Sequence, residues 1–373
     1  MKKVGIFGGT FNPVHKEHVE IAKHAVKELD LDVLFVMPTF ISPHKTTVPA
    51  SSTDRLNMLN LAFLGEDKIE VSDYEILKEG KSYTYQTVEE FKDRYKGAKL
   101  YFICGGDMLT DFKTWRFPQR ILDVCELAVF DREDFFTDYT AEEEYFSRFF
   151  GKTFIRLNYA PKKASSTKIR VYSSFNIPHG LSLNNVDEYI IKNNLYFSDK
   201  YTDFIKNNLK PSRIKHTADV VITALKKAKE LNLDPEKVRI SATLHDCAKY
   251  LDKQDFPDCN IPSDVPKPVE HAFLGAYVAK NVLGINDEEI IDAIRYHTSG
   301  KANMSTLSKL IFVADMIEEG RNYQGVDKLR QLYEGDFDIC FKECLKEETL
   351  HLKNKGQDIY KETLNAFEFY VKE

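Results

Sequence analysis

The chain has 373 residues and a formal net charge of −6, with 43% hydrophobic and 29% charged residues. This length exceeds one ordinary hydrophobic core, so two domains are expected. The mild acidity argues against a protein that binds nucleic acid through bulk charge. No apolar run approaches the ~20 residues of a membrane span, and the first residues lack the apolar core of a signal peptide. We therefore predict a cytoplasmic protein with neither nucleic-acid nor membrane partners.

Strands and helices alternate over the first half of the chain. Short apolar runs at 3–8, 32–37, 99–104 and 126–130 predict strands, and amphipathic stretches at about 16–29, 53–64 and 84–95 predict helices. Such alternation is typical of a parallel, Rossmann-like sheet of the α/β class. The acidic, aromatic segment at 131–150 has no assigned role.

The pattern becomes helical almost throughout after about residue 200, with Pro and Gly between the helical stretches. This predicts an all-α domain in the second half. A helical stretch ends near residue 197, and we place the boundary at 198–203. The predicted domains are residues 1–197 and 200–373.

Two glycines directly follow the first predicted strand in GIFGGTFNPVHKEH. Gly8 and Gly9 would let the backbone approach a phosphate closely, and Thr10 adds a hydroxyl. His15 and His18 lie one helical turn apart, so both can face the same anion. The motif is neither the dinucleotide fingerprint GxGxxG nor the P-loop GxxxxGK[ST]. A tight turn with two surface histidines remains the alternative.

A second motif, ASSTKIR, begins another predicted helix at 164–170. Its hydroxyl side chains could cap the helix, and Arg170 could bind a phosphate from the first turn. An ordinary helix cap with an exposed arginine explains these residues equally well when they are taken alone.

Together the two motifs resemble those of the nucleotidyltransferases with GTF-[DN]-P-x-H-x-x-H and S-S-T-x-I-R signatures. The nicotinate-nucleotide adenylyltransferases are the most similar group, because SPHK at 42–45, SYTYQT at 82–87, CGGDMLTDFKTW at 104–115 and VDEYIIKNNLY at 186–196 also match in order. Two positions depart from the pattern. Asn12 stands where Asp is commoner, and Glu17 stands where Gly is usual and would place a carboxylate near the triphosphate path.

The resemblance implies direct attack of nicotinate mononucleotide on the α-phosphorus of ATP, assisted by Mg²⁺. The implied catalytic residues are His15, His18, Lys45 and Arg170. The implied substrate-binding residues are Gly8, Gly9, Thr10, Phe11, Tyr83, Thr84, Tyr85, Gly105, Asp107, Trp115, Ser165, Ser166 and Thr167. Transfer to pantetheine phosphate or to nicotinamide mononucleotide are the alternatives.

The run VRISATLHDCAKYLD in the second half reads as one helix. Helical spacing places Ile240, Leu244 and Leu251 on an apolar stripe, with His245 and Asp246 off that stripe. Alone, such a His-Asp pair is best explained as a solvated helix face.

Further histidines and an acid join this pair along the chain. His216 lies in RIKHTADV, His271 in VEHAFLGA and His297 in RYHTSG, and Asp315 follows the apolar run IFVA. An acid in such a run is costly to bury unless it is paired or binds a metal. His and Asp side chains that converge from separate helices predict a metal site in a helical bundle.

The order His216, His245-Asp246, His271, His297 and Asp315 resembles the HD hydrolase superfamily, and its two extra histidines match the binuclear branch with Asp246 as the bridge. HDCAKY, EHAFLGA, IRYHTSG and ADMIEEGR resemble the YqeK-type group, which cleaves diadenosine tetraphosphate into two ADP. This implies two divalent transition metals, Fe first with Mn or Mg as alternatives, which activate a water. Candidate polyphosphate contacts are Lys249, Arg295 and Arg321.

Two alternatives stay open for the second half: hydrolysis of another nucleotide, or a regulatory nucleotide-binding module. The sequence also leaves open an oligomer.

Overall fold

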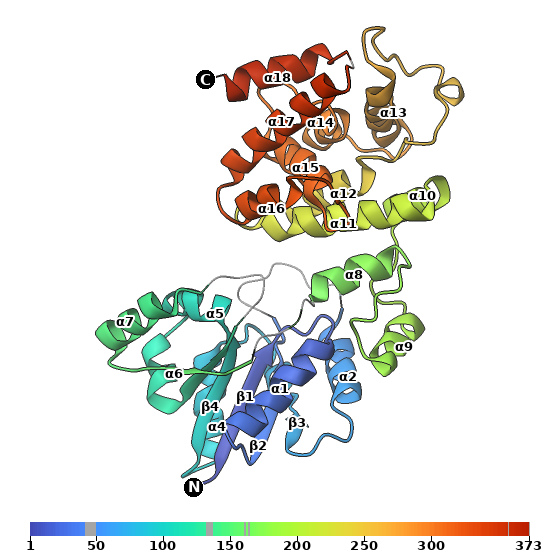
Figure 1. Ribbon diagram of the computed structural model, residues 1–373. Helices are drawn as coiled ribbons and strands as arrows, with labels where there is room; N and C mark the ends of the chain where they lie inside the picture. Colours follow the sequence, from blue (N-terminus) through green and yellow to red (C-terminus); the bar gives the residue numbers. More distant parts are fainter. Residues whose placement is uncertain (42–49, 132–136, 160–161, 163–164, 357, 373) are drawn as a thin grey trace. The chain divides into compact units, whose positions relative to one another are not determined.

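The structure, a computed structural model, describes residues 1–41, 50–131, 137–159, 162, 165–356 and 358–372. It comprises two compact units, coloured mainly blue to green and yellow to red in Figure 1. The first contains Met1–Arg170 and Pro178–Tyr196, and the second contains Val171–Ile177 and Phe197–Glu373. The predicted fold class, an α/β domain followed by an all-α domain, is confirmed.

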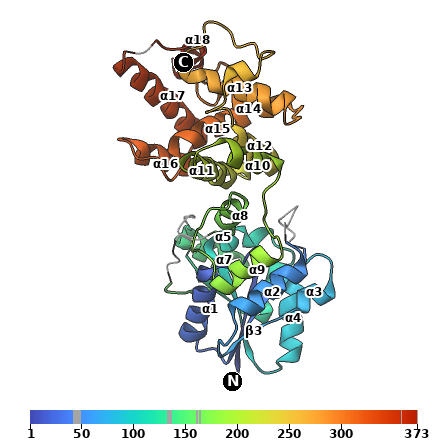
Figure 2. The ribbon, with the colours of Figure 1, turned by 90° about the vertical axis from the view of Figure 1, so that its right-hand side faces the viewer.

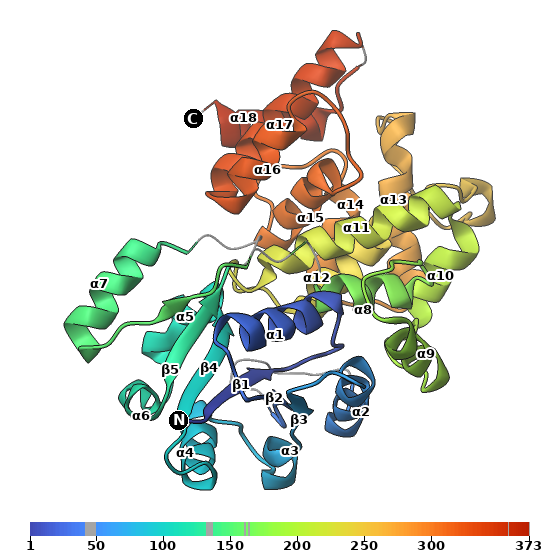
Figure 3. The same ribbon diagram turned by 60° about the horizontal axis from the view of Figure 1, so that its bottom comes forward.

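The first unit is built on a six-stranded parallel sheet with the order β3-β2-β1-β4-β5-β6. Figure 3 shows this sheet with helices on both faces. The strands are β1 (Lys3–Gly9), β2 (Val33–Pro38), β3 (Ile69–Val71), β4 (Lys99–Gly105), β5 (Glu126–Phe130) and β6 (Ile155–Arg156). The order reverses between β1 and β4, and ligands of open α/β sheets bind at such a point, beyond the carboxyl ends of the strands.

Side chains of β1 pack alternately on the two faces, as the period of a strand requires. Val4 and Ile6 join the core that includes α4 (Thr84–Arg94), α5 (Gly106–Asp111), α6 (Pro118–Val124) and α7 (Tyr139–Phe150). Phe7 joins the core formed with α1 (Lys16–Glu28), α2 (Ser52–Ala62) and α9 (Asn184–Lys192). Because both faces are covered, the strands are nearly continuous apolar runs.

Most of the predicted elements of the first half are present within one or two residues of the expected ends. The short strands β3 and β6 and the helix α3 (Tyr74–Lys78) were not predicted, because two to five residues carry no measurable period. The unassigned segment at 131–150 contains α7, which buries Phe146.

The second unit is a stack of helices (Figure 2). They are α10 (Lys200–Asn208), α11 (Pro211–Ala228), α12 (Pro235–Leu244), α13 (Lys267–Asn281), α14 (Glu288–Tyr296), α15 (Thr306–Ile317), α16 (Val326–Glu334), α17 (Phe337–Asn354) and α18 (Lys361–Val371). Helix α15 is buried nearly all round, since α11, α12, α14, α16 and α17 all pack on it. Within the described ranges, no helix combines the length and the apolar character needed to cross a bilayer.

The helix predicted through residue 251 ends instead at Leu244. The His245 side chain contacts the carbonyl of Ala242 through Nδ1 at 2.7 Å, and Cys247 donates its N–H to the Leu244 carbonyl at 3.1 Å. These contacts satisfy carbonyls that helix continuation would otherwise serve. The predicted helical stripe was therefore wrong beyond Leu244, and His245 and Asp246 lie in a turn.

Candidate functional site

The glycine turn lies at the carboxyl end of β1, beside the end of β4 where Gly105 begins the turn into α5. A Cβ on Gly9 would lie 2.9 Å from the ring of Phe11, so a side chain there would force this ring to shift. The predicted residues Gly8, Gly9, Thr10 and Phe11 thus lie at or just beyond the carboxyl end of β1, where the strand order reverses.

His15 and His18 lie together at the start of α1. Their rings stack with centroids 3.7 Å apart, and the His15 backbone N–H donates to Nδ1 of His18 at 3.2 Å. With Nδ1 accepting this bond, a neutral His18 carries its proton on Nε2 and can donate it to an anion. The amino end of α1 adds a partial positive charge at the same place.

Helix α8 (Ser166–Ser174) brings the second motif to the first. Ser166 Oγ donates to the Pro13 carbonyl at 2.9 Å, and Arg170 Nη1 donates to the Asn12 carbonyl at 2.7 Å. Thr167 Oγ1 accepts from Arg170 Nη2 at 3.0 Å, while Ser165 caps the helix. Burial lowers the pKa of Arg170, and no carboxylate of the described residues pairs with it. This buried charge is suited to a phosphate.

Two contacts that the sequence did not predict hold the turn between β1 and α1. Arg55 is only 1% exposed and donates to the carbonyls of Thr10 at 3.0 Å and Phe40 at 3.1 Å. Tyr196 donates its hydroxyl to the side-chain oxygen of Asn12. These partners lie 45 and 184 residues away in sequence, so no local pattern could have identified them.

Glu17, which departs from the family pattern, accepts hydrogen bonds from the Tyr159 hydroxyl and the Lys162 N–H, both at 2.9 Å. Its carboxylate therefore fastens the segment that leads into α8. Its position relative to the triphosphate path stays a prediction.

Further predicted substrate-binding residues lie on α4, on α5 and after it. Tyr83 is the N-cap residue of α4, and Thr84 is the first residue of this helix. Tyr85, in the first turn, is buried. Asp107 lies in the first turn of α5, and Trp115 packs edge-on against Phe102 with centroids 6.0 Å apart. Lys45 lies outside the described residues. The substrate contacts of these residues stay predictions.

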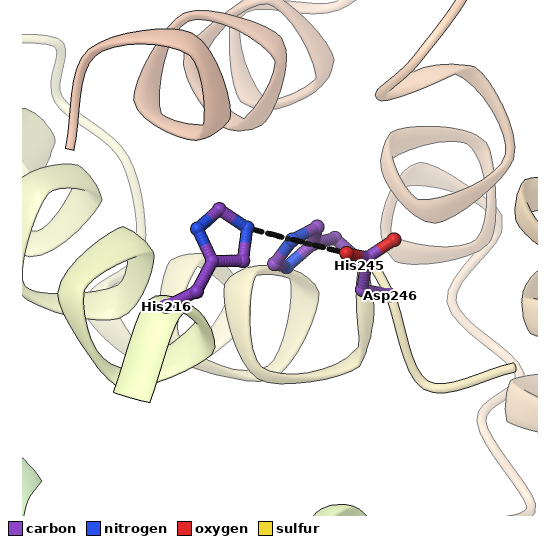
Figure 4. Close-up of side chains that lie close together, drawn as sticks. All are labelled: His216, His245 and Asp246. Carbon is purple, nitrogen blue, oxygen red and sulfur yellow. Dashed lines mark hydrogen bonds and ion pairs between the residues drawn. The ribbon is translucent and has the colours of Figure 1, made fainter. Parts of the chain in front are cut away.

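In the second unit, four predicted metal ligands converge from two helices and a turn. His216 (α11), His245 and Asp246 are drawn in Figure 4. Nε2 of His216 lies 4.0 Å from Asp246 Oδ2, and Nε2 of His245 lies 3.7 Å from the same oxygen. Oδ1 of Asp315, on α15, lies 3.0 Å from Nε2 of His216. We call these residues, His216, His245, Asp246 and Asp315, the first donor group.

Asp246 also belongs to a second donor group, with His271 of α13 and His297 at the end of α14. Its Oδ1 lies 3.0 Å from Nε2 of His271 and 3.5 Å from Nε2 of His297. The two oxygens of one carboxylate thus face two different sets of imidazoles. This is the arrangement that a bridging ligand requires.

The other ring nitrogen of three histidines is held by an acceptor. Nδ1 of His245 and His297 contacts the carbonyls of Ala242 and Ile294, both at 2.7 Å. Nδ1 of His216 contacts Glu318 Oε1 at 3.0 Å. These partners favour a proton on Nδ1, which leaves the Nε2 lone pairs directed at the donor cluster. The residues therefore fit a divalent metal.

The pKa shifts of three donors agree with that fit, whereas hydrogen bonds to Asp315 and Glu318 outweigh burial and raise the pKa of His216. Burial lowers the pKa of His245 to about 3 and also lowers that of His271. Burial alone would raise the pKa of Asp246, but the surrounding histidines hold it well below its usual range. Neutral imidazoles and ionised carboxylates are the protonation states that a metal requires.

Several cations surround the cluster. Arg213, which the sequence did not single out, donates to Asp246 Oδ2 at 2.8 Å. Lys249 Nζ lies 3.0 Å from Nε2 of His271, and Arg321 pairs with Asp315. Arg295 instead pairs at 3.4 Å with Asp292, which is not a donor. Of the three predicted polyphosphate contacts, Lys249 and Arg321 lie beside the donors.

Comparisons with known proteins agree with these two sites. A cytidylyltransferase-like family model matches residues 6–171, and an HD domain model matches residues 213–320. A Clostridium tetani protein named "Probable nicotinate-nucleotide adenylyltransferase" is 40% identical over 172 residues, 46% of this chain and 86% of the relative. A Bacillus subtilis protein named "Bis(5'-nucleosyl)-tetraphosphatase, symmetrical" is 34% identical over 174 residues, 45% of this chain and 94% of the relative. The chain therefore belongs to the cytidylyltransferase-like family in its first half and to the HD domain family in its second half.

Both family resemblances predicted from the sequence are thus confirmed. A further relative joins the two in one chain: a Mycoplasma genitalium protein named "Probable nicotinate-nucleotide adenylyltransferase/Ap4A hydrolase" is 29% identical over 328 residues, 87% of this chain and 89% of the relative. As an HD domain with a clustered His/Asp donor set, the second unit is a divalent-metal-binding domain.

Proposed function

We propose that this chain is a bifunctional cytoplasmic enzyme. Its first unit makes nicotinate adenine dinucleotide and pyrophosphate from ATP and nicotinate mononucleotide, as a step of NAD biosynthesis. Its second unit hydrolyses diadenosine tetraphosphate symmetrically to two ADP. The observation that carries this proposal is the relative whose name combines both activities and which aligns with most of this chain.

In the first unit, catalysis rests on positioning and on charge at the transferred phosphoryl group. His18 would donate from Nε2, the amino end of α1 adds a partial positive charge, and Arg170 supplies a buried cation. His15 fixes His18 by stacking and by its backbone N–H. Lys45 adds a further charge, and Mg²⁺ supplies charge neutralisation on the triphosphate.

The choice of mononucleotide tests this assignment. The purified chain should form nicotinate adenine dinucleotide from ATP and the acid mononucleotide, with a higher kcat/KM than for the amide. A preference for the amide, or product formation with pantetheine phosphate alone, would overturn the substrate assignment.

In the second unit, two divalent ions would be held by the two donor groups, with Asp246 between them. We propose Fe, with Mn or Mg as alternatives, because imidazole nitrogens dominate the donor set. When bound, the metals would lower the pKa of a water molecule and polarise phosphoryl oxygens. We propose that Lys249, which pairs with Asp246 Oδ1 at 3.4 Å, contacts the polyphosphate; Arg321 pairs with Asp315.

The products of diadenosine tetraphosphate test the second assignment. Chromatography should detect ADP as the single product, because symmetric cleavage breaks the central anhydride. AMP together with ATP would refute symmetric cleavage. Turnover of another nucleotide alone would change the substrate, and tight nucleotide binding without turnover would indicate a regulatory module.

A further inference from the structure

A short loop, residues 317–321, begins at the last residue of α15 and contacts two residues of the first donor group. Glu318, 3% exposed, accepts from Nδ1 of His216 at 3.0 Å. Arg321 donates from Nε to the Asp315 carbonyl at 2.7 Å and from Nη2 to the Asp315 carboxylate. Two of the four ligands in this group therefore depend on the 317–321 loop for their orientation.

The dependence of His216 on this loop distinguishes it from the other histidines. His245 and His297 are held by carbonyls three residues earlier in their own helical segments. The partner of His216 is 102 residues away and is a carboxylate. A displaced loop would leave His245 and His297 in place and release His216.

The side chain of Arg330, on α16, donates hydrogen bonds to backbone carbonyls of the 317–321 loop. Its Nε donates to the Ile317 carbonyl at 2.9 Å. Its Nη2 lies within 2.7–3.3 Å of three more carbonyls, those of Glu318, Glu319 and Arg321. Carbonyls at the end of a helix lack intrahelical partners, and a guanidinium satisfies several of them at once. The ion pair of Arg330 with Asp327 is exposed and adds little.

We propose that Arg330 is a positioning residue for the metal centre. It holds the 317–321 loop so that Glu318 orients His216 and Arg321 orients Asp315. The inference rests on the metal site of the proposed function and not on its substrate. Outer partners of metal-bound histidines typically change metal affinity by about 10- to 100-fold.

The experiment is a titration of the metal-free full-length chain with Mn²⁺ alone, followed by electron paramagnetic resonance of the free ion. Arg330→Met removes the fork and its charge, and Arg330→Lys keeps the charge but cannot reach all four carbonyls. Tyr333→Phe is the matched control, because Tyr333 lies on the same helix and donates to the Thr223 carbonyl at 2.8 Å, away from the loop. Thermal unfolding of each variant reports the general loss of stability.

Arg330→Met should weaken the tightest Mn²⁺ site by about 10- to 100-fold, with Arg330→Lys intermediate and Tyr333→Phe within about twofold of the wild type. Glu318→Gln, which leaves Arg330 intact, should give a similar loss and decides the matter if Arg330→Met does not fold. Wild-type Mn²⁺ affinity in Glu318→Gln or Arg330→Met, or an equal loss in Tyr333→Phe, would overturn the inference. A chain that binds Mn²⁺ tightly but leaves diadenosine tetraphosphate intact would contradict the proposed substrate only.

Discussion

Replacing Asp246 by Asn should abolish diadenosine tetraphosphate hydrolysis and spare dinucleotide synthesis. The carboxylate is 2% exposed, and its two oxygens face different donor groups at 3.0–4.0 Å. Loss of one preorganised charge at a reaction centre costs on the order of 10²–10³-fold in kcat. Because Asp246 serves both groups, the combined loss should be on the order of 10⁴-fold or more.

The matched control is Asp219→Asn. Asp219 is equally buried on α11, where it accepts from the Tyr172 hydroxyl and from Lys215 Nζ, both at 2.6 Å, and it belongs to neither donor group. A chromatographic assay of ADP, with dinucleotide synthesis measured on the same preparations, separates the two variants. Hydrolysis by Asp246→Asn within tenfold of the wild type, or an equal loss in Asp219→Asn, would refute a bridging role.

His18→Ala should lower dinucleotide synthesis by roughly 10²-fold or more while hydrolysis persists. The control is His24→Ala, which should leave both rates unchanged, because His24 pairs with Glu28 on the same helix. Comparable synthesis by both variants would contradict the role of His18. Asp199→Ala removes the cap of α10 and should lower the free energy of unfolding by about 1 kcal/mol at neutral pH. Burial alone would raise the pKa of Asp199, but hydrogen bonds and Arg239 hold it below its usual value. The difference in unfolding free energy between variant and wild type should therefore be complete above pH ~4 and fade as the pH falls through the folded pKa. A difference that persists unchanged at pH 2 would be inconsistent with this origin. Residues 1–197 and 200–373 should fold when expressed separately, and the second piece should unfold at a lower temperature than in the full chain because Tyr172 and Phe175 belong to its core; insoluble pieces would argue against two independent cores.

The first unit shows which features local patterns can predict. The four longer strands and both phosphate motifs carry strong periodicity or specific residues, and all of these strands form. Strand β6 has two residues and offers no signal. The buried Arg55 is equally silent in sequence, since an arginine in an amphipathic helix is usually exposed.

The second unit shows the same division between local and distant contacts. Residue type and order predicted six metal ligands, and the structure brings all six into overlapping groups. The roles of Arg213 and Glu318 depend on contacts 33 and 102 residues apart in sequence, which no spacing encodes. The end of α12 at Leu244 was missed because the apolar stripe continues past the point where side-chain contacts end the helix.

The number of metal ions per chain tests the shared position of Asp246 most directly. Elemental analysis gives the number of metal ions per chain for the wild type, in which both donor groups are intact, and for His297→Ala, in which the second group has lost a ligand. Two ions per wild-type chain and one in His297→Ala are predicted, because the variant removes one ligand of the second donor group whereas His216, His245 and Asp315 remain in the first. One ion per wild-type chain, unchanged in His297→Ala, would contradict a centre in which Asp246 bridges two metals.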